Sequence, residues 1–140
     1  MPSKAASTIL VCEDDPGLRL LLRLAIEPRG HRVIEAGEGA IAILLARNAE
    51  PDLVIVDMRL PDCSGIDVVR RLRSETGLTA MPIVMTSGSM QASDQRTAEE
   101  AGVDAFIQKP FDLHALVDEV ERLLSESESY RSALPLRRLH

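Results

Sequence analysis

Short runs of apolar, often β-branched residues alternate along the chain with longer segments in which apolar residues recur every three or four positions. The short runs are typical of β-strands, and the longer segments are typical of amphipathic helices. The short runs are mostly continuous, which indicates strands that are buried on both faces of a parallel sheet. The expected strands are residues 8–12, 31–36, 52–56, 81–86 and 104–108.

Five segments carry the helical spacing, and several residues mark where helices begin and end. Pro16 suits a first helical turn, and Asp112 is a plausible N-cap for the last helix. Gly30 and Gly102 suit the ends of helices that precede strands. The helical spacing covers residues 18–26, 41–45, 66–72, 90–101 (the weakest) and 113–124.

A βα unit repeated five times predicts a doubly wound α/β domain, in which helices cover both faces of a five-stranded parallel sheet. The length of 140 residues fits one such domain. We expect a single domain over residues 1–126. Beyond Leu124 the sequence SESESYRSALPLRRLH is too polar to bury a core, so residues 127–140 are expected to form a frayed or disordered tail.

Composition narrows the function classes. The chain is 45% hydrophobic and 27% charged, and no run approaches the roughly 18 apolar residues that a membrane span needs. The apolar stretch near the N-terminus is too short for a signal peptide, so we expect a cytoplasmic protein without membrane insertion. A net charge of -6 argues against direct DNA binding. Cys12 and Cys63 form no metal or disulfide motif and are expected to be unpaired thiols.

The candidate chemistry lies where the predicted strands end. Ligands of open parallel sheets bind beyond the carboxyl ends of the strands, so side chains that follow different strands can meet there. Clustered carboxylates repel one another, which either raises a pKa or demands a cation, and an all-oxygen site suits Mg²⁺. A lysine and a hydroxyl group beside them would complete a pocket for a phosphoryl group. The residues concerned are Glu13, Asp14 and Asp15 after the first strand, Asp57 after the third, Thr86 and Ser87 at the fourth, and Lys109 after the fifth.

Each of these residues also has an ordinary structural interpretation. An acidic run before a helix usually caps that helix, and an aspartate after a strand is usually a turn residue. Ser87 alone could be a loop hydroxyl, and Lys109 alone could be a surface charge. The combination is more informative than its members, because all of them fall at the same edge of a repeated βα pattern.

Four stretches give a family resemblance in order and spacing: ILVCEDDPGLR, PDLVIVDMRLPDCSG, MPIVMTSG and AFIQKPFD. Over residues 8–124 the chain resembles the receiver domains of bacterial two-component response regulators, of the small chemotaxis-regulator type. The resemblance implies a flavodoxin-like fold with strand order 2-1-3-4-5. It also implies signalling by phosphoryl transfer from a sensor histidine kinase or a histidine phosphotransfer protein.

By this resemblance, Asp57 is the phosphoacceptor and Mg²⁺ is the cofactor. Asp14, Asp57 and the backbone carbonyl of Arg59 would hold the metal ion, and Glu13 would bind it through water or orient the other ligands.

The remaining site residues contact the phosphoryl group or respond to it, again by resemblance. Lys109 would pair first with Asp57 and then with a phosphoryl oxygen, while Ser87 and the backbone N–H of Gly88 donate hydrogen bonds. The inward movement of Ser87 would let Phe106 turn in, and the surface of the fourth helix, fifth strand and fifth helix would change shape. An ordinary core position is the alternative interpretation of Phe106.

Three positions depart from the family's usual residues. Phe106 stands where tyrosine is common, so inward and outward forms would differ in packing alone. Gly88 replaces a small alanine and adds backbone freedom. Arg59 brings a guanidinium group near the site, where it could pair with a carboxylate or shield an acyl phosphate. The resemblance further implies a cis peptide bond between Lys109 and Pro110.

The expected function is that of a stand-alone receiver, or of the receiver portion of a longer hybrid protein. It would act on an unidentified protein target, without direct DNA binding, and would catalyse only its own phosphorylation and dephosphorylation.

Two other function classes remain open from the sequence. A phosphate-ester hydrolase of the haloacid-dehalogenase type would need a second aspartate where Arg59 stands. A receiver-like interaction module would act without phosphorylation, but the complete set of Asp14, Asp57, Ser87 and Lys109 argues against it.

Overall fold

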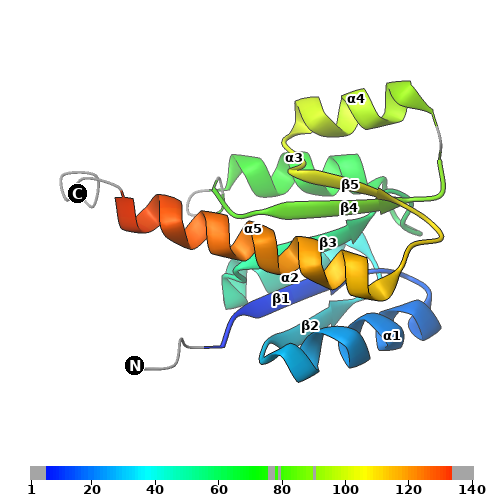
Figure 1. Ribbon diagram of the computed structural model, residues 1–140. Coiled ribbons are helices and arrows are strands. Elements are labelled where there is room, and N and C mark those ends of the chain that lie inside the picture. Colours follow the sequence, from blue (N-terminus) through cyan, green and yellow to red (C-terminus); the bar gives the residue numbers. More distant parts are fainter. Residues whose placement is uncertain (1–5, 76–77, 79, 90, 134–140) are drawn as a thin grey trace.

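The computed structural model contains one sheet of five parallel strands in the order β2-β1-β3-β4-β5 (Figure 1). The structure describes residues 6–75, 78, 80–89 and 91–133. The predicted strand order is confirmed, and each strand begins and ends within two residues of its expected bounds. The strands are β1 (Thr8–Cys12), β2 (Arg32–Ala36), β3 (Leu53–Asp57), β4 (Ile83–Ser87) and β5 (Ala105–Gln108).

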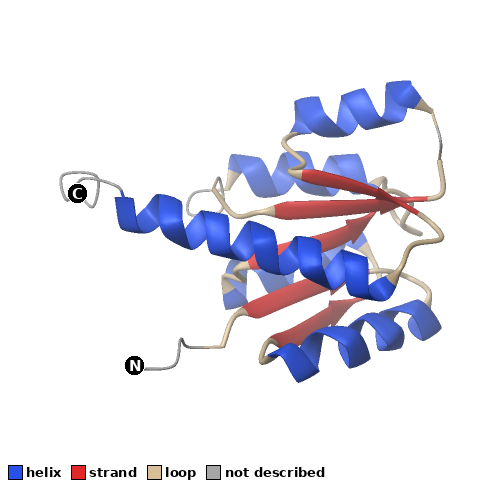
Figure 2. Cartoon of the chain, viewed as in Figure 1, coloured by secondary structure: helices blue, strands red, loops and turns tan. Residues whose placement is uncertain are grey.

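Helices cover both faces of the sheet, so the doubly wound α/β fold is confirmed (Figure 2). One face carries α1 and α5, and the other carries α2, α3 and α4. Within the described ranges, no helix is long and apolar enough to cross a membrane. The helices are α1 (Pro16–Ile26), the short 3-10 helix η1 (Glu27–Arg29), α2 (Gly39–Ala49), α3 (Gly65–Ser74), α4 (Ala92–Ala101) and α5 (Leu113–Ala133).

Strand β1 shows how the sheet is buried from both sides. Ile9 and Val11 pack into the cluster beneath α1 and α5, whereas Leu10 and Cys12 pack into the cluster beneath α2 and α3. All four side chains have an exposed fraction of 0%. Successive side chains of a strand point to opposite faces, which explains the continuous apolar run in the sequence.

The predicted helix ends are confirmed by their hydrogen bonds. The Asp15 carboxylate accepts the backbone N–H of Gly17 at 2.9 Å, so this member of the acidic run caps α1. Asp112 caps α5 in the same way, through the N–H groups of His114 at 2.8 Å and Ala115 at 3.1 Å. Gly102 ends α4 with a φ of 113°, a left-handed conformation that favours glycine.

The last helix is longer than the sequence indicates. Helix α5 continues through Ala133, so the expectation of a frayed tail is corrected for residues 127–133, and residues 134–140 lie outside the described part. No proline or glycine interrupts residues 125–133. Arg122 also pairs with Glu126 at 2.5 Å, one turn further on, a spacing that stabilises an exposed helix.

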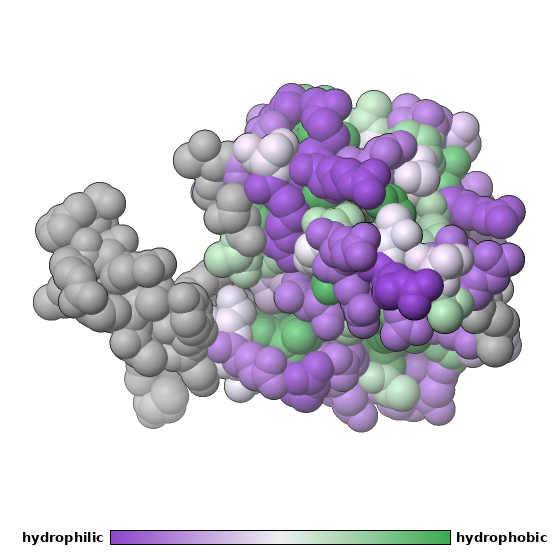
Figure 3. Space-filling model, turned by 90° about the horizontal axis from the view of Figure 1, so that it is seen from above, coloured by the Kyte–Doolittle hydropathy of each residue, from purple (hydrophilic) through white to green (hydrophobic). Residues whose placement is uncertain are grey.

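The surface seen from the side of α4 is largely hydrophilic, with small separated hydrophobic areas (Figure 3). Among the residues whose side chains the structure describes, the exposed large hydrophobic ones belong to α1 and α2. They are Leu20, Leu21, Leu24, Ile41 and Leu44.

Gly65 provides a test of how closely the loop after β3 packs. A Cβ atom at this position would lie 2.2 Å from the carbonyl oxygen of Asp57 and 2.9 Å from Cα of Met58, so alanine must displace backbone. We expect Gly65→Ala to lower the free energy of unfolding by about 1–3 kcal/mol, measured by urea denaturation.

Gly88→Ala is the matched control, because a Cβ atom there meets nothing within 4 Å. It should cost no more than about 0.5 kcal/mol. Equal denaturation midpoints for the two variants would contradict the close packing at Gly65.

Candidate functional site

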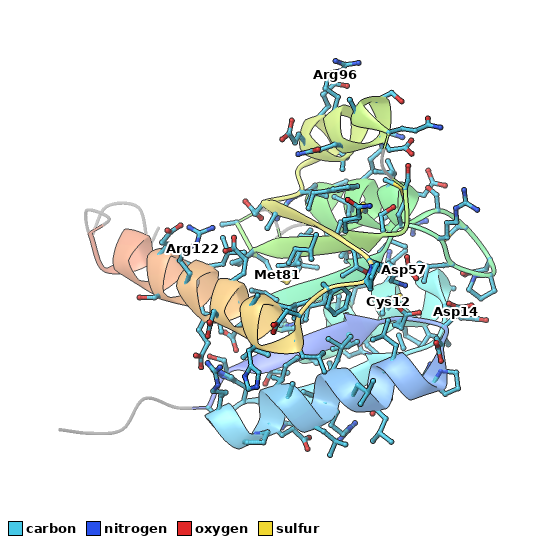
Figure 4. The ribbon with its side chains drawn as sticks, turned by 45° about the vertical axis from the view of Figure 1, so that its right-hand side comes forward. Cys12, Asp14, Asp57, Met81, Arg96 and Arg122 are labelled. Carbon is cyan, nitrogen blue, oxygen red and sulfur yellow. The ribbon has the colours of Figure 1, made fainter. Side chains whose placement is uncertain are left out.

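The carboxyl ends of β1 and β3 bring acidic side chains together. The two strands are neighbours, and Cys12 pairs with Val56 in the register of the sheet. The residues that follow this pair are Glu13 and Asp57, which therefore lie at the same edge of the sheet. Asp57 is the last residue of β3. Figure 4 shows Asp57 and Asp14 at this end of the molecule, with Cys12 beside them.

Three carboxylates form the centre of the site. One oxygen atom each of Glu13, Asp14 and Asp57 lies within 4.8 Å of the others. Glu13 is 2% exposed and Asp57 is 6% exposed, whereas Asp14 faces solvent. The cluster thus offers only oxygen ligands, and its exposed side leaves room for water. This set of ligands fits a hard cation such as Mg²⁺.

Lys109 reaches this cluster from the end of β5. Its Nζ atom donates to Oδ2 of Asp57 at 2.8 Å and to Oε1 of Glu13 at 3.0 Å. Burial opposes the charge on Lys109, but these two hydrogen bonds outweigh it and raise the pKa of the ammonium group. The cis peptide bond to Pro110, which the resemblance implied, is confirmed.

Glu13 is held in place from both sides. Its Oε2 atom accepts the backbone N–H of Asp15 at 3.0 Å, while Oε1 accepts from Lys109. Burial nevertheless raises the pKa of Glu13 above its ordinary value, with the nearby charge of Asp57 adding to the rise. Any further positive charge at the site would therefore stabilise the ionised form of Glu13.

The loop after β3 folds back on the phosphoacceptor candidate. The backbone N–H of Arg59 donates to Oδ1 of Asp57 at 3.2 Å, and the N–H of Gly65 donates to the carbonyl of Met58 at 2.6 Å. Within the part of the chain that the structure describes, no ion pair to the Arg59 side chain is found. The guanidinium group is instead exposed beside the site.

Ser87 lies next to this loop, and within the described part of the chain its hydroxyl makes no hydrogen bond to Asp57. Its hydroxyl donates to Sδ of Met58 at 3.5 Å and accepts the N–H of Ser89 at 2.9 Å. The side chain is buried at the end of β4. Phe106 is half-buried on β5 and packs against the core beneath α2, α3 and α4.

An open pocket of about 620 Å³ lies over the site. It is lined by the end of β3 and by the loops after β3, β4 and β5, and its lining includes four of the predicted residues but neither Ser87 nor Phe106. Ser89 and Gln91 are not among the predicted site residues, although both lie in the loop that follows β4. The lining residues are Asp57, Arg59, Gly88, Ser89, Gln91 and Lys109.

The two cysteines are free thiols, as the sequence predicts. Burial, followed by the charge of Asp62, raises the pKa of Cys12 to about 12. Burial also raises the pKa of Cys63. Both thiols are therefore protonated at neutral pH.

Comparisons with known proteins agree with this geometry. The model of the response regulator receiver domain family matches residues 9–121. The probable transcriptional regulatory protein TcrX of Mycobacterium tuberculosis is 35% identical over 117 residues, which cover 84% of this chain and 49% of the relative. The transcriptional regulatory protein KdpE of Mycobacterium tuberculosis is 41% identical over 103 residues, covering 74% and 44%.

The chain belongs to the response regulator receiver domain family. It spans about half the length of the curated relatives that it matches. A solved receiver domain of Methanospirillum hungatei, described as CheY-like, has a TM-score of 0.85 at 23% identity and covers 89% of this chain and 98% of its own. At that identity the likeness shows the shared fold alone.

The ion pairs of Lys109 provide a test of the site's electrostatics. We expect Lys109→Met to lower the free energy of unfolding at pH 7 by about 2 kcal/mol, because two buried carboxylates lose their partner while part of the loss is screened by water. Without Lys109 the pKa of Glu13 should rise further. The deficit should therefore shrink from pH 7 to pH 5, as the folded variant takes up a proton.

Arg96→Met is the control for Lys109→Met, because Arg96 is exposed on α4, far from Asp57 (Figure 4). It should change the free energy of unfolding by no more than about 0.5 kcal/mol. A deficit in Lys109→Met that is constant between pH 7 and pH 5 would show that unpaired carboxylates are not its cause.

Proposed function

We propose that this receiver domain accepts a phosphoryl group on Asp57 from a sensor histidine kinase or a histidine phosphotransfer protein. The observation that supports the proposal most strongly is the position of Lys109. Its ammonium group lies 2.8 Å from the Asp57 carboxylate, beside two further carboxylates and beneath an open pocket. A buried strand end thus presents a carboxylate nucleophile together with a positive charge for the transferred group.

In the proposed reaction, a carboxylate oxygen of Asp57 forms a bond to phosphorus while the bond from phosphorus to the donor's imidazole nitrogen breaks. The product is an acyl phosphate, and the donor histidine keeps the electron pair of the broken bond. Lys109 moves its hydrogen bond from Asp57 to a phosphoryl oxygen, and the N–H of Gly88 donates to another. Catalysis is positioning and electrostatic stabilisation by groups already in place.

Mg²⁺ is the proposed cofactor, and the donor chemistry of the site fits it. Asp14, Asp57 and the carbonyl of Arg59 would hold the ion, with Glu13 bound through water or orienting the others. When bound, it supplies the positive charge that offsets three carboxylates and the incoming phosphoryl oxygens.

The proposed output is a change of shape on the α4-β5-α5 surface. The hydroxyl of Ser87 makes only a weak hydrogen bond to Sδ of Met58, so a phosphoryl oxygen would be a better acceptor. Movement of Ser87 toward that oxygen shifts the loop that leads to α4. Phe106, half-buried beside this loop, then has room to turn inward.

The proposed target is a protein, in the cytoplasm, and the chain would act as a switch that catalyses only its own phosphorylation and dephosphorylation. The matched relatives are named as transcriptional regulators. The chain's net charge of -6 favours protein contact over DNA contact for this domain.

Phosphoryl uptake is measured by intact mass after incubation with acetyl phosphate and Mg²⁺. We expect one added phosphoryl group on the wild type, none on Asp57→Asn, and none when EDTA removes the metal. Asp118→Asn, at an exposed position of α5, should take up the group as the wild type does. An unmodified wild type would favour a receiver-like module that binds its partner without phosphorylation.

Binding of Mg²⁺ should stabilise the folded domain, since the unfolded chain holds no such cluster. At a Mg²⁺ concentration of 100 times the dissociation constant, the gain in the free energy of unfolding is about 2.7 kcal/mol. Asp14→Asn should lose most of this gain in urea denaturation, whereas Glu99→Gln on α4 should keep it. An equal gain in both variants would place the metal ion elsewhere.

A further inference from the structure

The loop between β3 and α3 is tied to the start of another helix by Asp62. Its Oδ1 atom accepts the backbone N–H of Gly39 at 2.8 Å, and Oδ2 accepts the N–H of Ala40 at 3.0 Å. Glu38, at the N-cap position of α2, makes no side-chain capping bond. The first turn of α2 is therefore capped by a residue 23 positions away in the sequence.

The loop and the helix are also packed too closely for a side chain at Gly39. A Cβ atom there would lie 2.4 Å from Sγ of Cys63 and 2.8 Å from Cγ2 of Val68. Glycine thus lets the tip of the loop reach the N-terminal end of α2. The hydrogen bonds of Asp62 and this close packing act at the same place.

The charge of Asp62 suits this position. The N–H groups of Gly39 and then of Ala40 hold the pKa of the Asp62 carboxyl below its usual range, so it is ionised at neutral pH. A negative charge at the N-terminal end of a helix interacts favourably with the helix dipole. The tie is therefore a charged, two-bond contact, although Asp62 itself is exposed.

The same loop carries the backbone that contacts the phosphoacceptor. At its base, the N–H of Gly65 donates to the carbonyl of Met58, and further out the N–H of Leu60 donates to the carbonyl of Cys63 at 3.2 Å. Arg59 lies between these two contacts, and its N–H donates to Asp57. The Arg59 backbone is thus fixed at the base by the loop's own bonds and at the tip by the contact with α2.

We propose that Asp62 is a positioning residue, which holds the Arg59 backbone against the phosphoacceptor by tying the tip of its loop to α2. This inference rests on the proposed function of Asp57. It predicts that loss of the tie weakens Mg²⁺ binding and slows phosphoryl uptake, because the Arg59 N–H and carbonyl are then less well placed.

The competing explanation is that Asp62 only stabilises α2 as a helix cap. Two variants separate the explanations. Asp62→Ala removes both the cap and the tie, whereas the double variant Glu38→Ser with Asp62→Ala restores a local cap without the tie. The extended backbone of Glu38, with φ of -153° and ψ of 164°, suits a serine N-cap.

Asp112→Ala is the matched control. Asp112 also caps a helix, α5, through two N–H groups at 2.8 and 3.1 Å, but these groups are only two and three residues away in the sequence, so this cap ties no distant loop to the helix. Each protein is tested by three measurements: the melting temperature, the Mg²⁺ dissociation constant by calorimetric titration, and the rate of phosphoryl uptake from acetyl phosphate.

We expect both single alanine variants to melt a few degrees, about 3 °C, below the wild type. Asp62→Ala should also bind Mg²⁺ about tenfold more weakly and take up the phosphoryl group more slowly. The double variant should recover the melting temperature but not the Mg²⁺ affinity. Asp112→Ala should keep the affinity of the wild type.

Recovery of both the melting temperature and the Mg²⁺ affinity in the double variant would show that Asp62 is only a helix cap and would overturn the inference. Unchanged Mg²⁺ affinity in Asp62→Ala would overturn it as well. A wild type that neither binds Mg²⁺ nor takes up phosphate would overturn the proposed function instead, so the two failures are distinguishable.

Discussion

The ion pair between Lys109 and the carboxylates of Asp57 and Glu13 is the interaction on which the site depends. Asp57 is 6% exposed and Glu13 is 2% exposed, so the two carboxylates are costly to bury together, and the ammonium group at 2.8 Å from Asp57 and 3.0 Å from Glu13 offsets much of that cost. The same proximity prepares the site for its proposed chemistry. A cluster that already holds one positive charge and still carries excess negative charge favours a divalent cation.

The fold makes this arrangement possible because its three central strands, β1, β3 and β4, are buried on both faces. Burial of β1, β3 and β4 fixes the ends of these strands, so the side chains that follow them meet at one edge of the sheet. The loops then refine the position of each group. Gly65 lets the loop after β3 fold back against Asp57, and Asp62 anchors the far end of the same loop on α2. Rigid strands place the carboxylates, whereas loops place the backbone around them.

Local pattern was sufficient to predict the strands and the helix cap at Asp112, and the ends of parallel strands predicted that Glu13, Asp14 and Asp57 meet if the first and third strands are neighbours. Capping of α1 was only the alternative interpretation of the acidic run, and in the structure Asp15 alone of that run makes the capping bonds. The strand order came from the resemblance to receiver domains. Other features depend on contacts that no local pattern encodes. The cap that Asp62 gives to α2 joins segments 23 residues apart, and the pocket lining by Ser89 and Gln91 follows from the path of one loop. The start of the continuation of α5 beyond Leu124 carries an exposed pair of Arg122 with Glu126, a weaker signal than an apolar stripe.

The central claim is that Asp57, the neighbouring carboxylates and Lys109 together form a site for a phosphoryl group and Mg²⁺. A crystal structure of the domain grown with Mg²⁺ and beryllofluoride, a stable mimic of a phosphoryl group, tests it most directly. We predict beryllofluoride on a carboxylate oxygen of Asp57, contacted by Lys109 and Ser87, with Mg²⁺ on Asp14 and Asp57. A structure in which Mg²⁺ occupies the cluster while Asp57 stays unmodified and paired with Lys109 would contradict the claim.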